Sequence, residues 1–172
     1  MPIKKLAFLL FVLVTAASCQ QLQAQQLKDG VPVDLNGLEV TFRIVNKETI
    51  SSGGTNYDRY KVVASVKNNS GKSLNVRLDK YPDAASISGG KLVEVNCLNA
   101  TGARLTSKRM TIGMLQHKVN VTYLARDKDG KLVNSTMLIV AGYYLDPGQS
   151  VEDNAIFIVP AGEEPKVTAR TL

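Results

Sequence analysis

The sequence predicts an all-β protein, an antiparallel β-sandwich of about eight or nine strands that follows a signal peptide. In several short segments apolar residues alternate with polar ones, which is the period of a strand with one buried face. Turn-forming residues separate these segments at intervals of about 8 to 12 residues, as in sandwich domains. Outside the leader no sustained apolar stripe has the 3.6-residue spacing of an amphipathic helix.

The N-terminus reads as a secretory signal peptide over residues 1–18. Lys4 and Lys5 precede an uninterrupted apolar run at 6–14, and small residues follow it. The run is too short to span a bilayer as a stable helix. We therefore expect an exported protein.

The residues at the cleavage site leave two interpretations open. Ala16-Ala17-Ser18-Cys19 resembles a bacterial lipobox, with Ala16 where leucine is usual. Lipidation of Cys19 would make this anchor the only contact with the membrane. Ordinary cleavage before Cys19 or after Ala24 would instead release a free periplasmic or secreted protein. Residues 19–33 are then expected to form a flexible tether, because they are rich in Gln and lack periodicity, and residues 34–172 form the sandwich.

The first half of the domain begins with a strand at 38–45, where apolar and polar residues alternate. A loop is predicted at 49–56, which contains Ser-Ser-Gly-Gly. Alternation resumes at 60–66, and Asn-Asn-Ser-Gly at 68–71 predicts a turn before a return strand at 74–78.

The pattern loosens between Asp79 and Lys118. Residues 92–98 predict a strand in which Cys97 is in phase with the apolar positions, so we expect a small buried side chain there. Residues 104–114 fit either a strand or an irregular crossing. Cys19 lies at the processing site and Cys97 is the single cysteine of the body, so no disulfide is expected within the mature domain.

Three apolar runs between 119 and 159 are separated by two turns. Asp129-Gly130 predicts a type I′ hairpin turn, and Asp146-Pro147-Gly148 a second turn with Gly148 in the left-handed region. The nine-residue run at 137–145 is too short for a membrane span and predicts a strand buried on both faces. A last short strand is expected at 166–172.

These segments together resemble a known family. The stretches 60–78, 121–133, 145–150 and 157–159 are similar to the FxLYD-type and telokin-like immunoglobulin-fold domains of exported bacterial proteins. The resemblance implies an immunoglobulin-like sandwich with an accessory or interaction role and supplies no catalytic residues. Residues 79–118 would be an insertion between two strands that the family joins closely.

The sequence gives little support for a catalytic function or for metal binding. His117 is the single histidine, and a Cys97–His117 nucleophile and base pair is the one catalytic arrangement to consider. The chain lacks clustered metal ligands and phosphate-binding loops, so no cofactor is expected. Without Lys4 and Lys5 the chain has 19 basic and 15 acidic residues, which is only a mild excess of positive charge. Nucleic-acid binding is not expected.

The sequence therefore predicts a non-catalytic domain that binds an envelope or extracellular protein, through residues 79–118 or an exposed sheet edge. A glycan-binding module that uses tyrosines is the alternative, and a small hydrolase with Cys97 and His117 is the third hypothesis. Of two adjacent tyrosines on a strand, one must face inward. The candidate contact residues are Tyr81, Arg104, Lys108, Arg109, Tyr143 and Tyr144.

Overall fold

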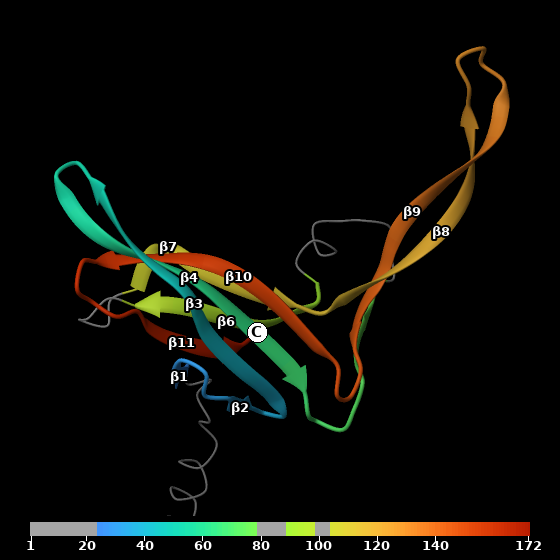
Figure 1. Ribbon diagram of the computed structural model, residues 1–172. Coiled ribbons are helices and arrows are strands. Elements are labelled where there is room, and N and C mark those ends of the chain that lie inside the picture. The colour runs from blue at the N-terminus through green and yellow to red at the C-terminus, as the bar shows by residue number, and fades with distance from the viewer. Residues whose placement is uncertain (1–23, 79–88, 99–103) are drawn as a thin grey trace, which may run out of the picture.

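The computed structural model describes residues 24–78, 89–98 and 104–172, and all regular structure in these ranges is β-strand (Figure 1). All strand pairs are antiparallel, so the predicted all-β antiparallel sandwich is confirmed. The described part contains eleven strands, where the sequence predicted eight or nine. It contains no helix that is long and apolar enough to cross a bilayer.

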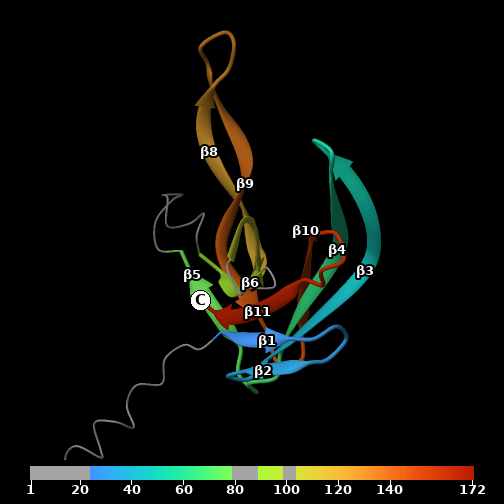
Figure 2. The ribbon, with the colours of Figure 1, turned by 90° about the vertical axis from the view of Figure 1, so that its left-hand side faces the viewer.

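Two four-stranded sheets, here called sheets A and B, form the sandwich (Figure 2). Sheet A has the order β1 (Gln25–Leu27), β11 (Lys166–Thr171), β6 (Lys91–Leu98) and β7 (Arg104–Gly113). Sheet B has the order β10 (Ser150–Pro160), β4 (Thr55–Asn68), β3 (Leu38–Ser52) and β2 (Val33–Leu35). The predicted strands at 38–45, 60–66, 92–98 and 166–172 are therefore all present.

A third sheet, sheet C, has the order β5 (Leu74–Arg77), β9 (Leu132–Leu145) and β8 (Leu115–Arg126). The hairpin of β8 and β9 projects away from the sandwich in both views (Figures 1 and 2). Only the base of this hairpin is three strands wide, because β5 pairs with β9 only from Gly142 to Leu145.

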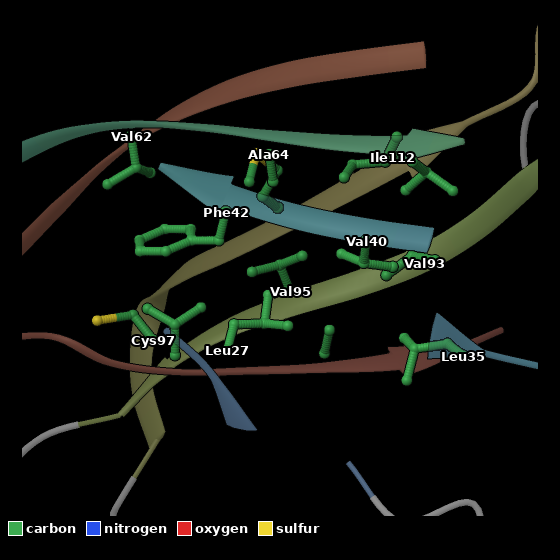
Figure 3. Packing of buried hydrophobic residues seen from close by; sticks show 14 of the residues in the cluster. Leu27, Leu35, Val40, Phe42, Val62, Ala64, Val93, Val95, Cys97 and Ile112 are labelled. Carbon is green, nitrogen blue, oxygen red and sulfur yellow. The ribbon is translucent and has the colours of Figure 1, made fainter. Parts of the chain in front are cut away.

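The core lies between sheets A and B (Figure 3). Alternate residues at 38–42 of β3 and 58–68 of β4 point inward and are almost completely buried, as the alternating pattern at 38–45 and 60–66 predicts. The rest of β3, from 43 to 52, is exposed or half-buried. The rings of Phe42 and Phe157 stack with centroids 6.3 Å apart. Cys97 is buried in this core, as predicted, and faces Val167 across the β6–β11 pair.

Three stretches differ from the expected boundaries. Residues 25–27, assigned to the tether, form β1, because Leu27 is buried in the core and the strand pairs with β11. The predicted loop at 49–56 is instead a tight hairpin that continues β3 into β4 through Gly53 and Gly54. Much of the presumed insertion at 79–118 is sandwich, since β6 and β7 lie within it and β6 is central in sheet A.

The two turns of the C-terminal half were predicted with unequal success. Gly148 has φ of 79° and the N–H of Gln149 donates to the carbonyl of Asp146, so Pro147-Gly148 forms the expected turn. The β8–β9 turn is not type I′, because Gly130 has a positive φ and Asp129 does not. It is a type I turn followed by a left-handed glycine, a common longer hairpin connection.

Asn68 joins sheet C to the sandwich. It is the last residue of β4 and is fully buried. Its amide nitrogen donates to the carbonyl of Lys72 at 2.7 Å and to that of Leu145, the last residue of β9, at 2.8 Å. Its side-chain oxygen accepts from the backbone N–H and the hydroxyl of Ser70. The side chain of Asn68 therefore hydrogen-bonds backbone groups both in the β4–β5 turn and at the end of β9.

Candidate functional site

The structure scatters the residues proposed as contacts from the sequence. Tyr81 and the lipidation candidate Cys19 lie outside the described residues. Arg104 and Lys108 belong to β7. Arg109, on the same strand, donates to the carboxylate of Glu94 at 3.2 Å. The basic cluster of the sequence is thus a stretch of one edge strand, and Arg109 is engaged in an ion pair.

Glu94 is a buried acid with three partners. Its carboxylate accepts from the amide of Asn96 at 3.0 Å and from the guanidinium groups of Arg109 and Arg170. The hydrogen bond from Asn96, and then the positive charges of the two arginines, hold the pKa of Glu94 below its usual value despite its burial. This cluster fixes β6 to β7 and β11 and is structural in character.

The Cys97–His117 pair is not assembled. Cys97 is buried between sheets A and B, whereas His117 is exposed on sheet C. β8 begins near Gly113, which pairs with Lys91 at the start of β6. Cys97 lies six residues further along β6, or roughly 20 Å away at the rise of a strand. The two side chains do not form a nucleophile and base pair in this structure.

The apolar run at 137–145 is not a strand buried on both faces, and this prediction was wrong. Leu138 is 60% exposed and Met137 38% exposed. The reason is that residues 132–140 of β9 pair only with β8, and no second sheet among the described residues packs on this ribbon. We call residues 118–140 the arm, and none of its residues is buried.

The two faces of the arm differ in composition. Residues that are directly opposite in the register share a face, so four pairs of residues define one side of the ribbon. This apolar face has a single polar residue among eight and consists of Val119, Val121, Tyr123, Ala125, Val133, Ser135, Met137 and Ile139. The opposite, mixed face carries Thr122 and Thr136, whose hydroxyls are 3.5 Å apart, together with exposed leucines such as Leu124 and Leu138.

Both edges of the arm are open in the described structure. β8 pairs only with β9, and β5 reaches no further along β9 than Gly142. The backbone N–H and C=O groups on the outer sides of β8 and of residues 132–140 are therefore available to another strand. An apolar face with two open edges is a surface suited to binding.

A different kind of site lies at the base of the arm. There Arg77 on β5 and His117 on β8 both lie opposite Gly142 on β9, so they flank a residue without a side chain. In the adjacent position on the same face, Tyr144 lies between Asn75 and Leu115. The ring of His117 meets that of Tyr144 edge to face, with centroids 6.4 Å apart.

Asn75, Arg77, His117, Tyr144 and Asp146 are among the residues that line a cavity of about 490 Å³, which is open to solvent. This volume is within the range of small-molecule sites. Asp146 lies at the other end of the cavity, roughly 13 Å along the chain from Gly142 at the rise of a strand. Ser73 donates its hydroxyl to the Oδ1 of Asp146 at 2.7 Å and so orients the carboxylate.

The two adjacent tyrosines play different parts. The ring of Tyr143 packs over Gly90, where a Cβ would collide with it, and strand alternation directs it to the other face of β9 from Tyr144. Tyr144 is half-buried and presents its ring to the cavity beside His117. Both tyrosines are half-buried and neither belongs to the core, so the expectation that one of the pair faces the core is not met. Tyr144 is the candidate contact. Arg77 and Asp146 were not proposed from the sequence, because the pairing of β5 with β9 that brings them together has no local signal.

Gly142 is required by the close approach of β5. A Cβ at this position would lie 2.6 Å from the carbonyl oxygen of Val76. We expect Gly142→Ala to push β5 away from β9, to cost about 1–3 kcal/mol, and to open the cavity. Urea denaturation and hydrogen exchange of β5 measure both effects.

The matched control is Gly113→Ala, where the new Cβ would lie 3.2 Å from the carbonyl oxygen of Gly90. That contact is tight but longer, so a smaller loss of stability is expected. Equal losses in the two variants would contradict the steric explanation.

No group of histidine, cysteine and acidic side chains in the described ranges could hold a metal ion. Comparison with protein-family models, with curated proteins and with solved structures found no match. The resemblance to FxLYD-type domains therefore stays a prediction from the sequence.

Proposed function

We propose that this chain is an exported, non-catalytic interaction domain that binds another envelope protein through the arm. The leader supports export, and Cys19 is the proposed anchor to the membrane. The observation that carries the proposal is the uncovered apolar surface of residues 118–140, which the domain does not use for its own packing.

The apolar face is unusual for a solvated ribbon. A strand with one side in water normally carries polar residues on that side. Here one side of the arm is almost entirely apolar, and the other adds Leu124, Leu132 and Leu138, each at least 60% exposed. Contiguous exposed apolar surface of this kind marks interaction sites in soluble proteins.

The size of the arm indicates how a partner binds it. The apolar face spans about seven residues of each strand, and at strand dimensions it offers roughly 250 Å². A stable interface needs about 800 Å² from each partner. The partner must therefore contact both faces and at least one open edge, so that it encloses the ribbon or adds a strand to it.

The charges of the arm favour a partner that differs from this chain. Lys118 and Arg126 lie on the β8 strand, and neither strand of the arm carries an acidic residue. The turn adds Lys128 and Lys131 against Asp127 and Asp129. Two copies would bring like charges together, whereas a partner with carboxylates around its apolar groove is complementary.

The test is site-specific photo-crosslinking in the native cells. A benzoylphenylalanine at Leu138 is expected to give one discrete adduct with a second protein, and the same probe at Val45, an exposed position on β3, is expected to give none. Adding Val121→Asp on the apolar face should remove the adduct without changing the melting temperature, because Val121 does not pack in the core.

Ile156→Asp, an equivalent change on an exposed residue of β10, is the matched control and should leave the adduct intact. Absence of an adduct from the arm, or its survival in the Val121 variant, would contradict the proposal. An adduct of twice the mass of the chain would show that the occupant is a second copy and would overturn the choice of a different protein.

A further inference from the structure

We propose that the cavity at the base of the arm binds an acidic saccharide, with a sugar carboxylate between Arg77 and His117 and a hydroxyl at Asp146. This inference concerns a different surface from the arm and does not rest on the protein-binding function. A glycan held on tyrosine rings alone could be neutral, whereas the ligand of this cavity carries a negative charge and is oriented by both ends of the site.

The cationic end of the cavity is built by strand pairing. Arg77 and His117 lie on the two strands that border β9, opposite the same residue, and Gly142 places no side chain between them. Neighbouring strands are about 4.8 Å apart, so the backbones of Arg77 and His117 lie roughly 10 Å apart, one on each side of β9. Arg77 makes no ion pair with any described residue, and its guanidinium is exposed. The carbonyl oxygen of Val76 lies close against Gly142, so a group that contacts both side chains would lie above this oxygen, between their outer ends.

A carboxylate suits this end better than a phosphate. The backbone of β9 is hydrogen-bonded on both sides from Gly142 to Tyr144, to β5 and to β8. Its N–H groups are thus not available for the backbone cradle that phosphate sites commonly use. The planar guanidinium of Arg77 instead matches a planar carboxylate through two parallel hydrogen bonds.

The middle and the far end of the cavity fit a sugar. Tyr144 supplies an aromatic ring with an apolar body, against which the C–H face of a pyranose can pack. Asp146 supplies an acceptor for a hydroxyl, because Ser73 occupies only its Oδ1. An acidic peptide would place carboxylates near Asp146, which disfavours it. Gly142 and Asp146 are four residues apart, a backbone span of up to roughly 13 Å, which is longer than one pyranose ring and leaves room for an oligosaccharide.

The experiment is a calorimetric titration of the full mature chain with a trisaccharide that carries one galacturonic acid residue at its end and two neutral galactose residues. The control ligand is the same trisaccharide with its carboxyl methyl-esterified, which removes the charge and keeps the rings. We expect the acid to bind at least tenfold more tightly than the ester. Arg77→Gln and Tyr144→Ala are each expected to weaken binding of the acid tenfold or more, with unchanged melting temperatures for Arg77→Gln.

The matched control variant is Arg43→Gln, which removes an exposed arginine from β3 on the sandwich. It should leave the affinity unchanged. Equal binding of acid and ester, equal losses in the Arg43 and Arg77 variants, or no binding of the acid would each overturn the proposal. Tighter binding of an acetylated trialanine with a free carboxyl would overturn the saccharide assignment and identify a peptide site. All of these outcomes are independent of crosslinking at the arm.

Discussion

Asn68→Asp is expected to destabilise the protein by about 3–4 kcal/mol. The substitution keeps the shape of the side chain but replaces its NH₂ group by an oxygen. That oxygen would lie 2.7–2.8 Å from the carbonyls of Lys72 and Leu145, which lose their donor and face a buried negative charge instead. For a chain of this size the loss corresponds to a fall in melting temperature of roughly 10 °C.

Asn120→Asp is the control, because it makes the same chemical change at an exposed position of the arm. Its effect on the free energy of unfolding is expected to lie within about 0.5 kcal/mol. Hydrogen exchange adds a local measurement: β5 should lose protection in the Asn68 variant before the sandwich does, since Asn68 holds the turn that leads into β5. Comparable losses in the two variants would refute the role assigned to Asn68 at this junction.

The sandwich was predictable because its signals are local. Alternation in β3 and β4 assigns Val40, Phe42 and Val62 to one face, and these residues are buried as the period of two requires. The Pro147-Gly148 turn depends on the backbone preferences of two adjacent residues, so the sequence also specifies it. Cys97 was placed correctly for the same reason, from its phase in a strand.

The arm was not predictable in this way. A run such as Met137-Leu138-Ile139-Val140 indicates a strand with two apolar faces, but not whether the protein itself covers them. Burial depends on which sheets pack together, and none of the sheets that the structure describes packs on the arm. A run with the composition of a core strand can equally belong to a binding surface that another molecule covers.

The cavity could not be predicted from the sequence for a related reason. Arg77, His117 and Tyr144 are far apart in the sequence and meet only through the register of β5 and β8 on β9. Alternation within β5 puts Arg77 on the face opposite Val76, but it does not specify the partner strand. The Tyr143-Tyr144 pair gave the nearest signal, because it required one ring to face away from the core.

Glu94→Gln is expected to lower the free energy of unfolding by about 2 kcal/mol at pH 7. The neutral amide loses its charge-assisted hydrogen bonds with Arg109 and Arg170, of which the former is 3.2 Å long and the latter 3.1–3.2 Å. We place the loss near the lower end of the range for such bonds, because both guanidinium groups are about half exposed and remain solvated in the variant.

The pH dependence separates this charge effect from a change in packing. In the folded protein the hydrogen bond from Asn96 and the two arginines lower the pKa of Glu94, so folding favours its ionised form. The stability that this provides is complete above the pKa of glutamate in the unfolded chain, about 4.3, and is lost as the pH falls through the lower folded value. Urea denaturation should therefore show a difference in the free energy of unfolding between the native protein and Glu94→Gln that is largest near neutral pH and disappears in acid.

The control is Glu152→Gln, at an exposed position of β10, which should differ little from the native protein at any pH. A gap at Glu94 that stays constant with pH would mean that the amide disturbs packing and that the charge contributes nothing.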